Sequence, residues 1–535
     1  MRASSTDWPL WARLSSGVVR ELVAIALAIA IILPATPVVA QETPPAVYDT
    51  IEIVPADGTV LRWGDHQYGG TLVVRGSSDG LVVTELIEPE EYLLGIQEVP
   101  FSWPIESLKA QAVAARTYLA WTLRRGRAGA GSTYGFDICA TDQCQVYGGL
   151  DQVEGPGGEQ WALAVTSTDS EVLLTNGVPA QALYSSTSGG RTRSVQDVFG
   201  GTALPYLQAV ASPDEVSPFV EWEVRFDVLQ LREILREAGL IEGSFTGIGV
   251  IETTDGAGPW LVDVEGRSTG RLNTWEFRSI VNRWAPRLYP DDFPGPRPDG
   301  RTYPQTILSP TFAIDFEIVQ PSFEPDSIWL GFEWVVRGQG WGHLVGMSQY
   351  GARAMAEAGA TYDEILTHFY TGLEPEQSPL LPDEIEVGLA WGAADAAISA
   401  DGPITVLADG EPVAEEVFGS WSFSTTGNRV AAAPPEGIGL PPTLANLEPT
   451  SAPSGRAITF TGTLSAPAEV RVVIFRGAEV VGITEWRVRD AGDVIAVWDG
   501  SLRDRIASPG AYRVMMEARS GEGKDHLFTT LSVIP

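Results

Sequence analysis

Glu98 stands where a carboxyl group could act as a general acid. It precedes a strongly predicted helix, and its neighbours Val99, Pro100, Phe101 and Trp103 are apolar. Apolar surroundings raise the pKa of a carboxyl group, which suits proton donation near neutral pH. A simpler explanation is also open, because a glutamate near the N-terminus of a helix stabilises that helix electrostatically.

A helix from about Pro104 to Arg125 must position Glu98. Ser102 is a suitable N-cap, and proline is tolerated in a first helical turn. Apolar residues recur every three or four positions and predict one buried face, made of Ile105, Leu108, Ala112, Ala115, Leu119 and Leu123. Lys109 and Arg116 share a neighbouring face.

Four sequence blocks extend this picture. The first holds Glu91 to Ile96, Glu98 to Pro100 and Trp103 to Tyr118. The others are Gln145 to Gly149 (QVYGG), Tyr184 to Thr192 (YSSTSGGRT) and Gly338 to Ala352 (GQGWGHLVGMSQYGA). In content and order they resemble the signature of the SpoIID/LytB family, which includes sporulation protein D and LytB, a modifier of a cell-wall amidase. One departure is Leu344, where the family usually has glycine.

The resemblance implies that Glu98 is the catalytic residue of a peptidoglycan lytic transglycosylase. In that reaction the 6-hydroxyl of MurNAc attacks C1 of the same MurNAc and displaces the adjoining GlcNAc, so one glutamate serves first as acid and then as base. An ordinary glycoside hydrolase needs two carboxyl groups, and the four blocks supply only Glu98 in such a position. The resemblance equally allows a non-catalytic wall-binding modifier that stimulates an N-acetylmuramoyl-L-alanine amidase.

The same blocks provide the candidate substrate-binding residues, namely Lys109, Arg116, Gln145, Tyr147, Ser186, Ser188, Gly189, His343 and Gln349. Arg116 could hold a sugar or pair with a structural carboxylate. Gln145, Tyr147 and Gln349 could line a groove or support the core. The serine and glycine residues suit close approach of a glycan, but a tight turn uses the same residues.

Composition limits the possible partners. The net charge of −34 excludes a general nucleic-acid binder, because phosphate binding needs a basic face. The same charge argues against an anionic membrane surface. We therefore expect peptidoglycan glycan strands as the substrate, and a cell-wall amidase as a further partner if the chain is a modifier. We expect no cofactor.

The first 40 residues resemble an export signal. Arginines precede the apolar run Leu22 to Leu33, and the small-residue site Val38-Val39-Ala40 follows. Cleavage there predicts a secreted or cell-wall protein without an integral membrane segment. An uncleaved anchor is the alternative.

Cys139 and Cys144 are the only cysteines. A close pair in an exported chain predicts a disulfide. Some relatives bind zinc near here, but a tetrahedral site needs four ligands and no histidine is nearby, so we predict no metal.

The pattern predicts a β-rich α+β fold with several domains. We expect a signal peptide at 1–40, a SpoIID-like domain at 46–375, a small β module at 380–434 and a Pro-rich linker at 435–453. Short strands separated by turns predict an Ig-like β-sandwich at 454–535.

Overall fold

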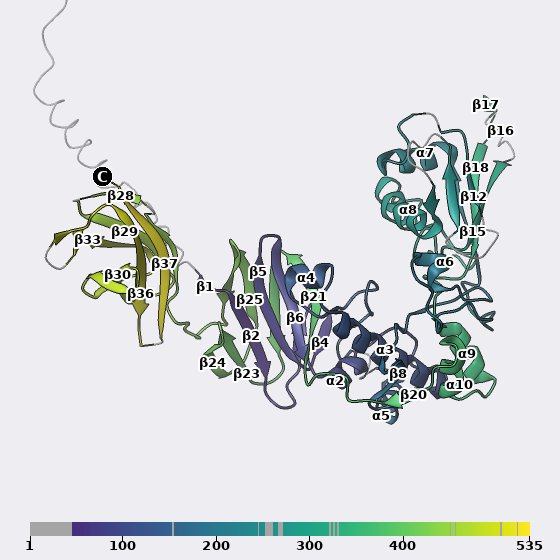
Figure 1. Ribbon diagram of the computed structural model, residues 1–535, viewed down its shortest axis with the longest axis horizontal. Coiled ribbons are helices and arrows are strands. Elements are labelled where there is room, and N and C mark those ends of the chain that lie inside the picture. Colours follow the sequence, from purple (N-terminus) through teal and green to yellow (C-terminus); the bar gives the residue numbers. More distant parts are fainter. Residues whose placement is uncertain are drawn as a thin grey trace, which may run out of the picture. The chain divides into compact units, whose positions relative to one another are not determined.

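The computed structural model describes residues 45–535 apart from 152, 154, 244, 252–259, 266–270, 320–322, 325–326, 329–330, 450, 455, 503–504, 522 and 535. The expected signal peptide, 1–40, lies outside the described residues. Two compact units hold the described chain, Pro45–Pro441 and Pro442–Pro535 (Figure 1). Most elements are strands, so the predicted β-rich α+β fold with several domains is confirmed. Among the described residues, no helix has the length and apolar character needed to cross a membrane.

Two sheets form a layered core in the Pro45–Pro441 unit. Their strand orders are β24-β23-β2-β5-β6-β21-β7 and β1-β26-β25-β22-β3-β4. The bounds are β1 Ala46–Tyr48, β2 Thr50–Pro55, β3 Leu61–Trp63, β4 His66–Tyr68, β5 Thr71–Ser77, β6 Gly80–Ile87, β7 Ile138–Cys139, β21 Ile385–Ala393, β22 Asp395–Ala400, β23 Ile404–Ala408, β24 Glu411–Val417, β25 Trp421–Thr426 and β26 Arg429–Ala433. Apolar side chains from both sheets share one hydrophobic core, which also receives one side of the long helix α3.

The predicted separate β module at 380–434 is wrong. Its strands pair with the N-terminal ones: β23 with β2, β21 with β6 and β26 with β1. Alternating apolar residues predict a strand but not its partner, so sequence distance suggested a false boundary. The predicted linker at 435–453 is also wrong in part, because β27 (Leu444–Glu448) and β28 (Ser451–Pro453) lie within it.

Helix α3 (Ile105–Arg125) is the central element of the site region and packs against α5, α9, α10 and β8. Ala112 and Ala115 face the sheet core, whereas Ala110 and Ala114 face a second core with α9 and α10. Small side chains let neighbours approach on both sides. The predicted single apolar face was therefore too narrow. The predicted N-cap Ser102 is wrong, because the helix begins after Pro104 without a side-chain cap.

Shorter elements complete this part of the unit. They are α2 Pro89–Leu94, α4 Ala130–Tyr134, α5 Gly158–Ser167, α6 Val195–Phe199, α9 Gln349–Glu357, α10 Tyr362–Phe369, β8 Glu171–Thr175, β9 Val178–Pro179, β10 Tyr184–Ser185, β19 Met347–Ser348 and β20 Pro375–Gln377. Strands β10 and β19 pair in parallel, with Tyr184 opposite Met347. This pairing brings the third and fourth sequence blocks together.

A lobe with its own core is inserted between β10 and β19. It contains the sheet β11-β18-β15, the sheet β12-β13-β14 and helices α7 and α8 (Figure 1). The bounds are β11 Glu221–Asp227, α7 Val228–Glu237, β12 Ile248–Ile251, β13 Leu261–Val264, β14 Leu272–Asn273, α8 Thr274–Leu288, β15 Phe312–Val319, β16 Phe323–Glu324, β17 Ser327–Ile328 and β18 Gly331–Gln339.

The Pro442–Pro535 unit consists of two sheets around one core. Their orders are β27-β29-β33 and β28-β37-β36-β30-β31, with β32 beside β30. The remaining bounds are β29 Ile458–Leu464, β30 Ala468–Arg476, β31 Glu479–Ile483, β32 Arg487–Arg489, β33 Gly492–Trp498, β34 Ser501–Leu502, β35 Arg505–Ile506, β36 Gly510–Arg519 and β37 Lys524–Ile534. A two-sheet arrangement was expected here; whether it is Ig-like stays a prediction.

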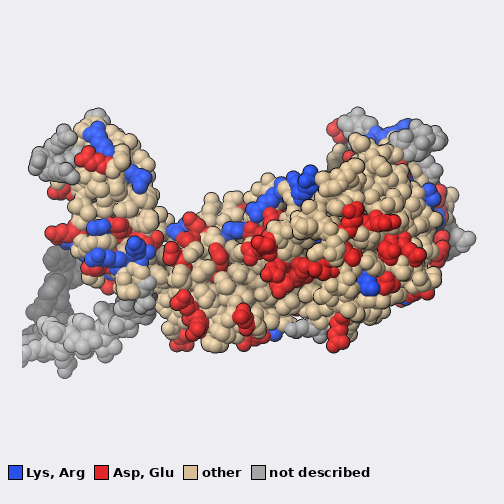
Figure 2. Space-filling view, turned by 60° about the horizontal axis from the view of Figure 1, so that its bottom comes forward, with Lys and Arg blue, Asp and Glu red and all other residues tan. Residues whose placement is uncertain are grey.

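Acidic side chains are more frequent than basic ones on the face of the molecule that Figure 2 displays. Figure 2 shows several clusters of Asp and Glu on the displayed face and fewer Lys and Arg. Such a surface repels phosphate groups, which is the physical basis for expecting no nucleic-acid partner.

Candidate active site

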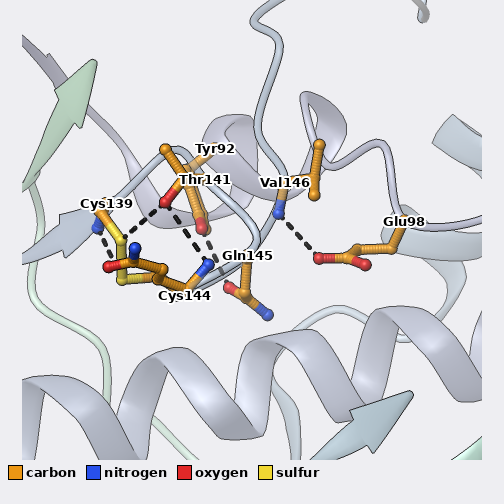
Figure 3. Close-up of a disulfide and its surroundings, with 8 residues drawn as sticks. Tyr92, Glu98, Cys139, Thr141, Cys144, Gln145 and Val146 are labelled. Carbon is orange, nitrogen blue, oxygen red and sulfur yellow. Dashed lines mark hydrogen bonds between the residues drawn. A yellow bond between two sulfur atoms is a disulfide. The ribbon is translucent and has the colours of Figure 1, made fainter. Parts of the chain in front are cut away.

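Glu98 lies in the connection between α2 and α3, where two chain segments run side by side. The Gln97 amide donates to the Val146 carbonyl oxygen at 2.8 Å, and the Gly148 amide donates to the Gly95 carbonyl oxygen at 3.0 Å. Next to the Gln97–Val146 bond, the Val146 amide donates to Oε1 of Glu98 at 2.7 Å (Figure 3). The carboxyl group is therefore fixed by the backbone of the second sequence block.

The environment of Glu98 favours its protonated form. The residue is partly exposed, and burial raises the pKa of its carboxyl group. Hydrogen bonds from the Val146 amide and from the side chains of Gln349 and Tyr184 act in the opposite direction, and the negative charge of Asp142 raises the pKa further. The net direction is upward, so the group keeps its proton at higher pH than an ordinary glutamate. Because Glu98 is also partly exposed, its carboxyl group can reach a substrate and act as an acid.

Gln145 supports this site from the protein core. Its side chain is fully buried, accepts a hydrogen bond from the Tyr92 hydroxyl at 3.0 Å and donates to the Ala115 carbonyl oxygen at 3.2 Å. It also donates to the Tyr184 hydroxyl at 3.0 Å, which positions the tyrosine that contacts Glu98. Gln145 therefore acts on the core and not on a bound sugar.

Tyr147 has a supporting role as well. It is buried, stacks on Tyr92 with 4.9 Å between ring centroids, and donates its hydroxyl to Oε2 of Glu85 at 2.6 Å. Burial raises the pKa of Glu85 to about 7. The proposal that Tyr147 touches substrate does not fit this position. Gln349, the first residue of α9, does lie beside Glu98 and remains a candidate.

Arg116 is a structural residue: of the two roles considered for it, the structure shows the pairing with a carboxylate and not the contact with a sugar. It is fully buried and makes a two-pronged ion pair with Glu90, at 2.7 and 2.6 Å. It also donates to the carbonyl oxygens of Val165 and Glu171. Lys109, on the same helix, forms an ion pair with Glu106, one turn earlier in α3. Its ammonium also lies 5.5 Å from the centre of the Tyr362 ring and so links α3 to α10.

Arg116→Met should lower the free energy of unfolding by about 2–3 kcal/mol. The carbonyl oxygens of Val165 and Glu171 each lose one hydrogen bond, at about 0.5–1.5 kcal/mol each, and Glu90 loses its cationic partner. The loss stays below that of a fully buried ion pair because Glu90 is 37% exposed and can be hydrated. Urea denaturation followed by tryptophan fluorescence measures the shift. Arg124→Met, an exposed change on the same helix, should alter stability by less than about 0.5 kcal/mol; equal effects of the two substitutions would contradict this role of Arg116.

The serine-glycine block is organised by Asp214, which the sequence analysis missed. This carboxylate is fully buried. It accepts hydrogen bonds of 2.6–3.2 Å from the amides of Ser188, Gly189 and Gly190 and from the hydroxyls of Ser188 and Ser348. Ser188 and Gly189 thus face a buried carboxylate, which argues against the predicted contact with a glycan.

Ser186 has a different position in the same block. It is partly exposed, and its carbonyl oxygen accepts a hydrogen bond from the Tyr350 amide at 3.0 Å. Tyr350 in turn packs edge-on against Trp103, with 4.9 Å between ring centroids. Ser186 is therefore still a candidate for contact with substrate, as a residue that links the third and fourth blocks.

His343 is mostly buried and uncharged. Burial, together with the positive charge of Arg278, lowers its pKa to about 4. Its Nδ1 accepts a hydrogen bond from the Val345 amide at 3.0 Å, so the ring proton of the neutral form is on Nε2. The ring lies 5.8 Å from Phe199 and 6.5 Å from Trp275, measured between centroids. A neutral, enclosed imidazole suits positioning of the loop better than binding of an anion.

Leu344 is the departure from the family pattern, and its backbone explains the usual glycine. It has φ of +65°, a left-handed conformation that costs a side-chain-bearing residue about 1–2 kcal/mol. Its side chain is nevertheless buried, with 1% exposed. The apolar contacts offset the backbone strain in this chain.

Leu344→Gly should therefore lower the free energy of unfolding by about 1–3 kcal/mol despite relieving the strain, because emptying a buried leucine site costs about 2–5 kcal/mol. Leu344→Ala keeps the strain and loses most of the same packing. The glycine variant should consequently be the more stable of the two, the reverse of the usual order at a strand or helix position. Thermal or urea unfolding of both variants checks the order; a more stable alanine variant would show that strain is absent.

The structure contains a disulfide between Cys139 and Cys144, whose Cα atoms are 5.5 Å apart (Figure 3). It closes a turn in which the Cys144 amide donates to the Thr141 carbonyl oxygen at 2.9 Å. The turn connects β7 to the Gln145–Val146 segment that holds Glu98. With both sulfur atoms bonded to each other, neither is a thiolate ligand for a metal.

Comparison with known proteins agrees with the signature. Residues 77–174 match the family described as SpoIID, stage II sporulation protein. An uncharacterized protein of Brachyspira hyodysenteriae is 27% identical over 330 residues, which are 61% of this chain and 76% of that protein. Stage II sporulation protein D of Bacillus subtilis is 28% identical over 300 residues, 54% of this chain and 75% of that protein. The amidase enhancer of Bacillus subtilis is 28% identical over 294 residues, 51% of this chain but only 38% of that protein.

These matches relate the chain to proteins that are named for sporulation and for amidase enhancement. The chain carries a SpoIID domain, and the predicted SpoIID/LytB resemblance is confirmed. Among solved structures, titin Ig tandem domains cover 26% of this chain at 10% identity and a TM-score of 0.12, which is too low to support a fold assignment.

Proposed function

We propose that this protein is an extracytoplasmic peptidoglycan lytic transglycosylase in which Glu98 serves as acid and then as base. The observation that carries the proposal is the partly exposed Glu98 carboxyl group, whose pKa is raised by burial and whose position is fixed by the Val146 amide. Glu98 lies inside the matched SpoIID segment.

The chemistry needs a single carboxyl group. Protonated Glu98 donates its proton to the glycosidic oxygen as the bond from that oxygen to C1 of MurNAc breaks. The 6-hydroxyl oxygen of the same MurNAc then forms a bond to C1 and gives its proton to the Glu98 carboxylate. The products are a 1,6-anhydro-MurNAc end and a strand with a new free hydroxyl, and the enzyme regains its starting protonation state.

The test is a digest of peptidoglycan glycan strands from which stem peptides have been removed. Wild-type protein should release fragments with 1,6-anhydro ends, which are lighter by one water than hydrolysis products and are separated by mass spectrometry. A digest that yields only reducing ends would indicate hydrolysis, and no release would refute the catalytic proposal.

A second candidate function follows from the similarity to the amidase enhancer. In that case the protein binds glycan strands and accelerates an N-acetylmuramoyl-L-alanine amidase without cutting glycosidic bonds. Stimulation of a purified cell-wall amidase that is unchanged by Glu98→Gln, with no anhydro ends, would favour this function.

A further inference from the structure

The inserted lobe has a hollow of about 550 Å³. Most of the residues that line it lie outside the four sequence blocks. It lies along β11 and β18, close to the start of β15. Its most informative lining residues are Glu221, Glu223, Trp260, Tyr303, Arg337 and Gln339. A hollow of this size lies within the usual range for small-ligand sites.

The floor of the hollow is polar because of strand register. Glu221 is paired with Gln339 across β11 and β18, and Glu223 is paired with Arg337. Side chains alternate along a strand, so these four project on the opposite face from Trp222, which is buried in the lobe core. The floor thus offers planar amide, carboxylate and guanidinium groups: Glu223 and Arg337 are bonded to each other, and the Glu221 and Gln339 side chains are exposed.

Aromatic side chains form the walls. Trp260 is partly exposed, and the guanidinium of Arg193 lies 4.5 Å from its ring centre. Arg193 also donates to the Thr311 hydroxyl at 3.2 Å, which fixes it beside the ring. Tyr303 contributes a second ring, and its phenol has a hydrogen bond with the backbone of Glu223. Aromatic walls above a polar floor match the two faces of a pyranose ring, which has apolar C–H groups and hydroxyls at its rim.

The charge of this face decides which sugar fits. Arg337 is bonded to Glu223 at 2.7 Å and to Asp315 at 3.1 Å, and Arg225 is bonded to Glu223 at 2.7 Å. Both guanidiniums therefore already have carboxylate partners. Five carboxylates on this face of the sheet outnumber these two guanidiniums and that of Arg193 beside Trp260: Glu221, Glu223, Asp315, Glu317 and Glu333. Of these five, Glu221 and Glu223 line the hollow. A ligand that carries a carboxylate would be repelled, whereas a neutral sugar would not.

We propose that this hollow binds a neutral N-acetylhexosamine unit by stacking on Trp260 and hydrogen bonding to the Gln339 and Glu221 side chains. Its identification as the GlcNAc unit of a peptidoglycan strand rests on the proposed function. MurNAc, which carries a lactyl carboxylate once its peptide is removed, would be repelled by the Glu221 carboxylate, for which the described part of the chain shows no arginine partner. The hollow is a binding subsite on the lobe and contributes no group to bond cleavage.

The binding test uses full-length Glu98→Gln protein labelled with 5-fluorotryptophan and the probe tri-N-acetylchitotriose. The ¹⁹F resonance that disappears in Trp260→Phe identifies Trp260. This resonance should shift on titration, and Trp260→Ala should weaken binding by about threefold to tenfold. Trp260→Phe, which keeps a ring, should stay within about threefold. A Trp260 resonance that does not move, or an unchanged Kd in Trp260→Ala, overturns the proposal.

A control and a charged probe complete the test. Trp486→Ala removes a partly exposed tryptophan with a stacked arginine from the other unit and should leave the Kd unchanged. A muramyl disaccharide with a free carboxylate should shift the Trp260 resonance less than chitotriose does at the same concentration. A larger shift with the muramyl probe overturns the choice of a neutral sugar. Because this readout does not depend on cleavage, a shift without anhydro products would refute the proposed activity and leave the subsite intact.

Discussion

Glu98→Gln should lower the release of anhydro-ended fragments by roughly 10²- to 10⁴-fold, the usual contribution of a positioned general acid. The amide has nearly the same shape as the carboxyl group, and its oxygen can still accept the hydrogen bond from the Val146 amide. It cannot give a proton to the glycosidic oxygen or take one from the 6-hydroxyl. Initial rates on peptide-free glycan strands, measured by mass spectrometry, give the size of the loss.

Glu91→Gln is the matched control, because Glu91 is an exposed glutamate in the same sequence block. It should leave the rate within about twofold of the wild type, as expected for a surface position that takes no part in the chemistry. If Glu98→Gln kept its activity while folding normally, the assignment of Glu98 as the acid would be wrong and the amidase-modifier function would take precedence.

The pH profile should carry the same signature. Catalysis begins with protonated Glu98, so the rate should fall as pH rises through its pKa. Burial raises that pKa, and the falling limb should therefore lie above the value of about 4.3 for an unperturbed glutamate. Whatever activity remains in Glu98→Gln should lack this limb. A wild-type rate that already declines near pH 4 would contradict the effect of burial.

Asp214→Asn should have the largest effect on stability, a loss of about 3–5 kcal/mol, because a hydrogen bond to a charged group contributes about 1.5–3 kcal/mol and one between neutral groups about 0.5–1.5 kcal/mol. Five donors converge on this carboxylate, and an asparagine offers one oxygen and turns an NH₂ group toward the remaining donor. Four donors bond to Oδ2, so an asparagine oxygen at that position keeps them as weaker, uncharged bonds, whereas the Gly190 amide on Oδ1 would face the NH₂ group and lose its acceptor. Urea unfolding should show an earlier transition for the Pro45–Pro441 unit, and hydrogen exchange at the amides of Ser188, Gly189 and Gly190 should accelerate.

Glu215→Gln gives the comparison for Asp214→Asn. Glu215 is the next residue in the chain and is exposed, so the same change of charge should move the urea midpoint very little. Similar midpoints for the two variants would mean that the carboxylate does not organise the serine-glycine block.

The sequence was most informative where the signal is local. The position of Glu98 before α3 follows from the motif and from helix periodicity. The hydrogen bonds from Gln349 and Tyr184 to Glu98 join distant segments, so only the order of the blocks hinted at them. Asp214 carried no signal, because its donors lie on other segments and a single aspartate in a loop is ordinary.

The errors and the open alternative have equally physical causes. A sugar contact stayed open for Arg116 because charged residues are rarely fully buried, and its partner Glu90 lies on another helix. Ser102 has the composition of an N-cap, but Pro104 takes that position. Strand patterns at 385–433 were recognised, whereas their pairing with the first strands of the unit was not, since pairing partners are set by the tertiary fold.

The pairing of β2 with β23 has a consequence for how the protein folds during its synthesis. Val54 in β2 is paired with Thr405 in β23, so the sheet that supports Glu98 is completed only by residues near the end of its unit. Closing so large a loop costs entropy before any contact rewards it, and such topologies fold slowly. A ribosome or translocation pore must therefore deliver nearly the whole unit before Glu98 is held in place, and a chain cut short before β23 would expose an unpaired strand edge that invites aggregation.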